Sequence, residues 1–140
     1  MKYVRAVAEE YVKKHEGTRL KPYTDSRGIL TIGVGHNLEQ GISAAACDFI
    51  FKEDMYKAEA LLIEKCPVFM MLDANRQVVL IDLCFNLGIN GLLGFKKMLA
   101  ALEKQDFEKA AAELMDSRYA KQVPTRAREN RDVLLTGKLK

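Results

Sequence analysis

Apolar residues recur three and four positions apart through most of this 140-residue chain, which is the spacing of an amphipathic α-helix. The first such stripe consists of Val4, Val7, Ala8, Tyr11 and Val12. It predicts a helix over residues 3–15, which Gly17 ends. Because the stripe needs an apolar partner larger than a small sheet, we expect this helix to pack against the helical part of the chain.

Later segments repeat the helical spacing. They predict helices over 43–65, 95–102, 106–115 and 125–135. Ser43 is the expected N-cap residue of the first of these. Residues 74–87, which follow Asp73, are apolar on almost every side, and such a helix belongs in the middle of a bundle. We therefore expect 74–87 to be the core helix, ended by Gly88 and followed by a glycine-punctuated corner.

Residues 15–36 break this pattern, because they hold turn residues and short runs in place of a continuous apolar stripe. Residues 20–23 and 29–33 are predicted to be strands joined by the turn 25–28, and further β structure is expected over 34–38. The chain is therefore predicted to be α+β, mostly α, with one small β insertion near its front.

The composition, 49% hydrophobic and 29% charged residues, is typical of one soluble globular domain. No stretch reaches the ~18 apolar residues of a membrane span. The first residues lack the apolar centre of a signal peptide, so we expect the protein to stay in the cytoplasm unless another factor releases it.

The charge distribution and the cysteines exclude only a few classes of function. Residues 118–140 hold seven Lys and Arg against two Asp and Glu, a net +5, although the whole chain is only +3. A solvated helix face explains this excess, and attraction to nucleic acid or cell wall is the second interpretation. Cys47, Cys66 and Cys84 lack metal-ligand spacing and are expected to be buried free thiols, so no metal and no cofactor are expected.

Two carboxylates and a hydroxyl flank the predicted hairpin. Glu16 ends the first helix, Asp25 follows nine residues later in the turn, and Thr31 follows six residues after that. Folding of the hairpin brings Asp25 and Thr31 together, facing the end of the helix. Glycosidic cleavage uses such a pair, because one carboxyl protonates the leaving oxygen and the other activates water or attacks carbon. On spacing alone, however, surface decoration is the commoner explanation.

These residues belong to a longer pattern, E-G-x-R-L-x-x-Y-x-D-x-x-G-x-x-T-I-G-x-G-H, which resembles that of the phage-type lysozymes (endolysins, glycoside hydrolase family 24). It is filled here by Glu16, Gly17, Arg19, Leu20, Tyr23, Asp25, Gly28, Thr31, Ile32, Gly33, Gly35 and His36. Residues 85–88, the corner up to Phe95 and residues 117–127 resemble later family blocks, whereas 37–72 match loosely. Asn86 and Tyr119 depart from the family, where Gln and Trp are common.

The resemblance implies a muramidase that cuts the β-1,4 bond between N-acetylmuramic acid and N-acetylglucosamine in peptidoglycan. It implies that Glu16 is the general acid, that Asp25 is the base for the attacking water, and that Thr31 positions this water. The substrate-binding residues that it implies are Asn37, Phe85, Asn86, Met98 and Glu113, and Phe85 is equally consistent with a core position.

Two further residues are expected near the site in structural roles. The resemblance places Arg126 beside Glu16. His36 is expected to pair with a carboxylate, because Glu16 and Asp25 already fill both catalytic roles.

The resemblance also implies a lysozyme-like two-lobe fold within one domain, 1–140, with a cleft between the lobes. Helix 1–15 would pack on the helical lobe, 16–41 would form the small β lobe, 43–65 the bridging helix and 66–140 the helical lobe. The expected partner is peptidoglycan, with no nucleic acid and no stable membrane association. A monomeric enzyme of phage or prophage origin would wait in the host bacterial cytoplasm until a separate holin releases it to the wall.

Two other functions stay open. A lytic transglycosylase acts on the same polymer but needs no water-activating carboxylate, so the presence of Asp25 and Thr31 argues against it. A non-catalytic domain that binds cell wall or nucleic acid through its basic C-terminal helix gives no reason for the spacing of Glu16, Asp25 and Thr31.

Overall fold

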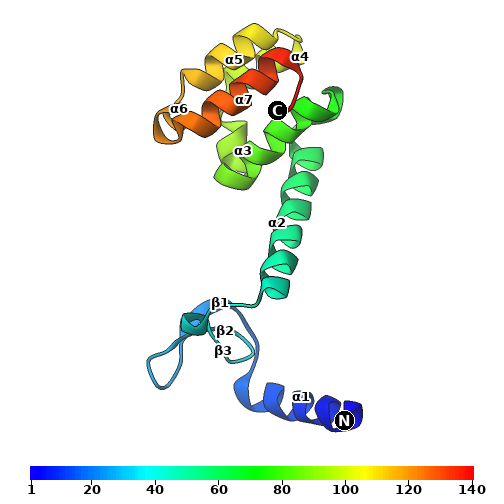
Figure 1. The fold of residues 1–140 in the computed structure, drawn as a ribbon, viewed down its shortest axis with the longest axis vertical. Coiled ribbons are helices and arrows are strands. Elements are labelled where there is room, and N and C mark those ends of the chain that lie inside the picture. The colour runs from blue at the N-terminus through cyan, green and yellow to red at the C-terminus, as the bar shows by residue number, and fades with distance from the viewer. The chain divides into compact units, whose positions relative to one another are not determined.

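The computed structural model describes residues 1–140, which divide into two units, Met1–Phe49 and Ile50–Lys140. The first unit holds the whole β-sheet, the helix before it, and a short 3₁₀ helix and the start of a long helix after it, whereas the second holds only helices and turns (Figure 1). The prediction of a mostly helical α+β chain with one small sheet is confirmed. The packing of the first helix on the helical lobe and the cleft between the lobes stay predictions.

The first unit begins with α1 (Lys2–Glu16), which ends where Gly17 takes a positive φ of 72°. A three-stranded antiparallel sheet follows, in the order β1 (Arg19–Thr24), β2 (Leu30–Gly33), β3 (His36–Asn37). The predicted strands and the turn between them are confirmed. The short 3₁₀ helix η1 (Leu38–Gln40) closes the sheet region.

The long helix α2 (Ala44–Lys65) begins where the sequence predicts. The Ser43 hydroxyl accepts a hydrogen bond of 3.1 Å from the amide of Ala46, which is the N-cap interaction expected of a serine at this position. The division between the units falls between Phe49 and Ile50, so α2 contributes residues to both.

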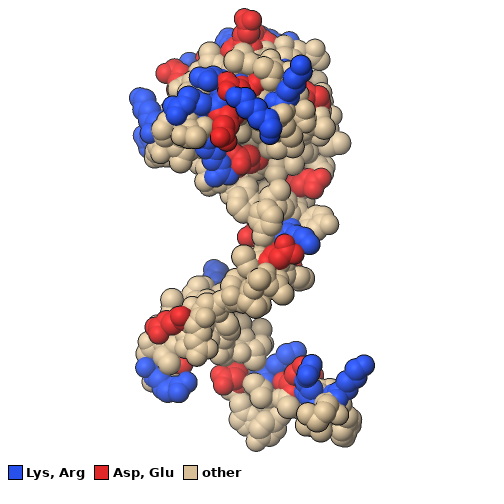
Figure 2. Space-filling view, viewed as in Figure 1, with Lys and Arg blue, Asp and Glu red and all other residues tan.

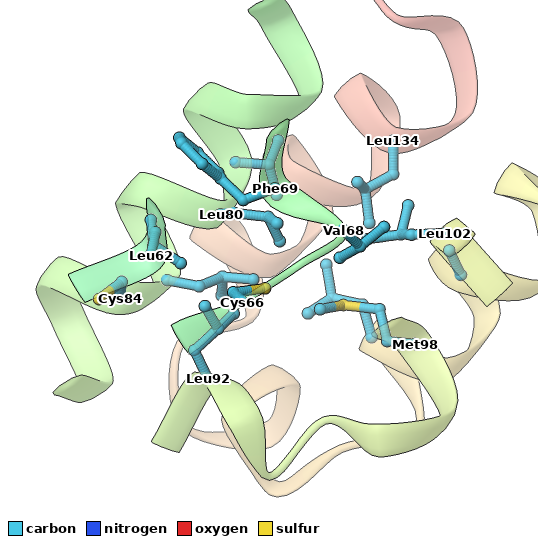
Figure 3. Close-up of a cluster of buried hydrophobic side chains, with 14 of the residues drawn as sticks. Leu62, Cys66, Val68, Phe69, Leu80, Cys84, Leu92, Met98, Leu102 and Leu134 are labelled. Carbon is cyan, nitrogen blue, oxygen red and sulfur yellow. The ribbon is translucent and has the colours of Figure 1, made fainter. Parts of the chain in front are cut away.

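The second unit continues with η2 (Phe69–Met71) and the helices that form its core. These are α3 (Ala74–Leu93), α4 (Lys96–Glu103), α5 (Phe107–Met115), α6 (Arg118–Gln122) and α7 (Pro124–Thr136). Asp73 and Asp106 cap α3 and α5 through their carboxylates. All the buried hydrophobic side chains lie in this unit, and Figure 3 shows leucines of α2, α3, α4 and α7 converging with Phe69 and Met98.

Several predicted helix boundaries in the second unit are wrong. The corner after residue 87 is itself helical, because α3 kinks at Gly88 (φ 78°, ψ 166°) and then continues to Leu93. The helix α6 was not expected, and α7 begins at Pro124 rather than Thr125. Proline is favoured in the first turn, where a missing N–H costs nothing.

The core helix is less uniformly buried than its composition suggests. Its length and mean hydropathy of 1.2 suit a membrane-crossing helix, yet only part of it faces the core. Val79, Leu80 and Leu83 are buried, whereas Val78 and Phe85 are 42% and 41% exposed. Helical geometry therefore leaves α3 one open side, although almost every residue on it is apolar.

Two of the three cysteines follow the prediction. Cys66 and Cys84 are buried and free, and burial raises the pKa of both thiols. The prediction is wrong for Cys47, which is free but exposed, because it lies in the first turn of α2 where no buried residue surrounds it.

Candidate active site

Asp25 is fixed by the hairpin turn that it begins. Its Oδ1 accepts hydrogen bonds from the amides of Arg27 (2.8 Å) and Ile29 (2.9 Å), and its own amide donates to the carbonyl of Ile29. The hydrogen bond from the amide of Ile29 is the main cause that lowers the pKa of Asp25. Desolvation opposes it, and the amide and the charge of Arg27 lower the pKa further. The side chain is therefore ionised near neutral pH, and its Oδ2 accepts from no protein donor.

Thr31 is the one buried residue of the first unit, with 3% of its surface exposed. Its hydroxyl donates to the carbonyl of Ile29 over 2.8 Å. Because the hydroxyl proton is committed to this bond, the oxygen can meet another group only as an acceptor. A water molecule beside Thr31 would have to donate one of its protons to it.

The strand register places these two residues on one face of the sheet. Thr31 pairs with Tyr23 in β1 and with Asn37 in β3. Asp25 lies two residues beyond Tyr23, and its amide bond to Ile29 continues the ladder by one step. Side chains two apart on a strand share a face, so Asp25, Thr31 and Asn37 point to the same side.

Glu16, the last residue of α1, lies against the turn between β2 and β3. A Cβ atom at Gly35 would lie only 2.8 Å from its Oε2, and Gly35 has a φ of 65°. The positive φ therefore favours glycine at this position, whereas the flexible end of the Glu16 side chain could move away from a Cβ atom. The carboxyl of Glu16 makes no hydrogen bond or ion pair with the protein, so it is held by this contact alone.

The neighbouring polar residues His36 and Asn37 form hydrogen bonds with nearby backbone groups. His36 contacts the carbonyl oxygen of Gly41 through Nε2 over 2.9 Å. This partner is a backbone carbonyl five residues on, and the expected pairing of His36 with a carboxylate stays a prediction. Asn37 accepts from the amide of Glu39 and so caps η1, while its side-chain nitrogen donates to no protein atom.

The other predicted substrate-binding residues lie in the second unit. Phe85 is half-exposed, meets Phe51 edge-on with ring centroids 5.8 Å apart, and lines a cavity of about 380 Å³. Asn86 next to it is exposed. Met98 is a core residue with 1% exposure, although it borders a second cavity, of about 290 Å³, together with the partly exposed Glu113.

Arg126 forms an ion pair that the sequence did not reveal. Its Nε and Nη2 donate to the two carboxylate oxygens of Asp82 over 2.9 and 2.6 Å, and the side chain of Asn130 donates to the same carboxylate. Burial alone raises the pKa of Asp82, but the hydrogen bonds from Arg126 and Asn130 outweigh it, so the pKa is lowered. The only signal was an acidic residue inside the apolar run 78–87.

This ion pair borders a cavity of about 600 Å³, where α3 meets the start of α7. Asn130 also reaches the hydroxyl of Tyr119, which is buried and meets Phe95 edge-on. Tyr119, which stands where the family commonly has Trp, is therefore part of the core. The expected closeness of Arg126 to Glu16 stays a prediction.

The family model described as phage lysozyme matches residues 13–132, which include the hairpin and most of the helical unit. The chain belongs to the phage lysozyme family. As a lysozyme it is a glycoside hydrolase that acts on peptidoglycan.

Similar proteins share most of this lysozyme's length. "Probable T4-type lysozyme 1" of Dictyostelium discoideum is 27% identical over 94% of this chain and 95% of its own. The endolysin of Salmonella phage P22 is 35% identical over 71% and 73%. The pre-baseplate central spike protein Gp5 of Enterobacteria phage T4 is 26% identical over 93% of this chain, but the match covers only 28% of that protein.

Proposed function

We propose that this lysozyme cleaves the β-1,4 bond between N-acetylmuramic acid and N-acetylglucosamine by inverting single displacement. Glu16 protonates the leaving oxygen, Asp25 accepts a proton from the attacking water, and Thr31 orients that water. The observation that carries the proposal is the hydrogen bonding at the hairpin: Asp25 is ionised with one oxygen unused, and Thr31 can only accept.

These two acceptors suit one water molecule. A water that donates one proton to Oδ2 of Asp25 and the other to Oγ1 of Thr31 has both protons engaged, so a lone pair is directed away from the protein. That lone pair attacks the anomeric carbon as Asp25 takes the proton. Glu16 carries no protein hydrogen bond that would compete with the leaving oxygen.

The hydroxyl argues for inversion rather than retention. A carboxylate that attacks carbon directly lies ~5–5.5 Å from the acid, whereas an inverting pair is ~6.5–9.5 Å apart and holds a water between. A nucleophilic Asp25 would have no use for the acceptor oxygen of Thr31. A bound water needs this second hydrogen-bond partner, because one partner alone does not orient it toward the anomeric carbon.

The biological setting is part of the proposal. The enzyme acts on the wall of a host bacterium, and we propose that it is a monomer that waits in the host cytoplasm until a holin opens the way. The names of the endolysins that it resembles support a role in cell lysis.

The stereochemistry of the first product tests the mechanism. Proton NMR of peptidoglycan fragments during the first minutes of hydrolysis should show the α-anomer of the new reducing muramic acid. A fresh β-anomer would refute inversion. A 1,6-anhydro end would instead establish the transglycosylase reaction, in which Asp25 has no such role.

A further inference from the structure

The backbone of Ile29 lies between the two groups that the proposed mechanism places around the attacking water. Its amide donates to Oδ1 of Asp25 over 2.9 Å. Its carbonyl oxygen accepts from the hydroxyl of Thr31 over 2.8 Å and from the amide of Asp25 over 2.9 Å. The proposed base and the proposed water-orienting hydroxyl are therefore both bonded to one residue, whose side chain is not part of the apolar core.

Gly28 sets the direction of this backbone. It has a φ of 80°, and its amide donates to the carbonyl oxygen of Asp25 over 3.0 Å, which closes the turn. Hairpin loops of this length use a positive φ to return the chain into the next strand. A Cβ atom at Gly28 would meet nothing within 4 Å, so the backbone conformation, and not a lack of space, favours glycine here.

We infer that Ile29 is a positioning residue for hydrolysis that acts through its backbone, held in place by the left-handed conformation of Gly28; this inference rests on the proposed function. The amide of Ile29 engages Oδ1 of Asp25 and so leaves Oδ2 for the water. The carbonyl takes the proton of the Thr31 hydroxyl and so leaves that oxygen as an acceptor for the same water.

No other group in the hairpin links the two acceptors in this way. The second amide on Oδ1, from Arg27, contacts the carboxylate of Asp25 but not Thr31. Without the backbone of Ile29, the carboxylate is free to rotate and the hydroxyl is free to donate its proton to the water. Misplacement of a reacting group by about 1 Å costs up to ~10²-fold in rate, so both bonds bear on turnover.

An ester at position 29 tests the amide alone. The α-hydroxy analogue of isoleucine, incorporated at a stop codon, removes the N–H and keeps the side chain and the carbonyl. We expect kcat on purified peptidoglycan to fall about fivefold to twentyfold. The NMR titration of the Asp25 carboxyl carbon should move to higher pH, because the amide that lowers the pKa of Asp25 is gone. The same exchange at Lys21, in the irregular part of β1 between Arg19 and Tyr23, is the matched control and should change neither.

Glycine variants test the turn that holds Ile29. Gly28→Ala should lower kcat about tenfold, whereas Gly28→Asn should stay within about threefold of the wild type, because asparagine adopts a positive φ more readily. Gly41→Ala is the control for strain, since Gly41 has a φ of 74°, equally open space and no hydrogen bond with Asp25 or Thr31. Both alanine variants should lower Tm by about 2–6 °C, but only Gly28→Ala should lose activity.

The results separate this inference from the proposed mechanism. If the ester leaves kcat or the Asp25 titration unchanged, or if Gly28→Ala and Gly41→Ala lose activity equally, Ile29 has only a structural role and the inference is wrong, while the muramidase mechanism stands. If Asp25→Asn retains wild-type turnover, Asp25 is not the base, and the mechanism and the inference that rests on it are both wrong.

Discussion

The two units of this lysozyme are each stabilised internally, and by different interactions. In the first, Thr31 is the one buried residue, and the proposed catalytic groups are placed by backbone hydrogen bonds at the hairpin and by the contact of Glu16 with Gly35. In the second, the helices α2 to α7 all contribute to an apolar core, part of which Figure 3 shows. The difference teaches that the proposed catalytic groups and the core residues are different side chains, so substitutions can separate activity from stability.

The two units have similar net charges, +1 for residues 1–49 and +2 for residues 50–140. Figure 2 shows Lys and Arg side chains gathered on the second unit with acidic side chains among them. The basic excess of residues 118–140 belongs to α6, α7 and the end of the chain. Asp82 of α3 lies outside this segment and neutralises one charge of the excess through its ion pair with Arg126. The choice between a solvated helix face and attraction to a polyanion stays a prediction.

The largest effect is expected at Glu16. Glu16→Gln removes the proton donor and should lower kcat by about 10³-fold, within the range for general acids. Its Tm should stay within about 2 °C of the wild type, because the carboxyl makes no hydrogen bond or ion pair. Turnover of purified peptidoglycan and thermal unfolding are the measurements. Glu10→Gln on the same helix is the control, and equal losses in both variants would contradict the assignment.

Truncation of a leucine should cost far more free energy of unfolding in the second unit than in the first. Leu83→Ala empties a fully buried position of the second unit and should cost about 2–5 kcal/mol in the free energy of unfolding. Leu20→Ala, in β1, changes a side chain that is 86% exposed and should cost under about 0.5 kcal/mol. Urea unfolding measures both. Similar losses in the free energy of unfolding would mean that Leu20 is packed in an apolar core of the first unit.

A smaller effect is expected at Thr31. Thr31→Val keeps the shape but removes the water acceptor, and should lower kcat by about 10–100-fold while KM stays nearly unchanged. Thr31→Ser keeps the hydroxyl and should recover most of the activity. Thr24→Val, at the end of β1, is the matched control. A rise in KM without a loss of kcat would show that Thr31 binds sugar instead of water.

The smallest effect concerns the ion pair of Asp82 with Arg126. Because the folded pKa of Asp82 is lowered, its contribution to stability is present above the unfolded pKa and is lost as pH falls through the folded value. Asp82→Asn should therefore cost about 1 kcal/mol at pH 6, allowing for solvent screening of the half-exposed pair, and progressively less towards pH 3. Urea unfolding across this range measures the difference, with Asp54→Asn, an exposed carboxylate of α2 without an ion pair, as the control. A cost independent of pH would show that the charge of Asp82 is not what stabilises the fold.

Short-range features could be predicted from the residues themselves. Ser43, Asp73 and Asp106 cap helices because the side chain and its amide partner are three residues apart. The hairpin turn is equally local, since Asp25 bonds to residues two and four positions on. The placement of Asp25 and Thr31 on one face then follows from the register of neighbouring strands.

Other features were decided only by the tertiary structure. Asp82 meets Arg126 across 44 positions of sequence, and no periodicity connects residues so far apart. Met98 is buried and Cys47 exposed although both are apolar in character, because burial depends on which elements pack around a residue. The sequence by itself therefore determined the local backbone frame that holds the proposed catalytic residues Asp25 and Thr31. Packing between distant helices decided which polar groups are paired and which charged residues line a cavity.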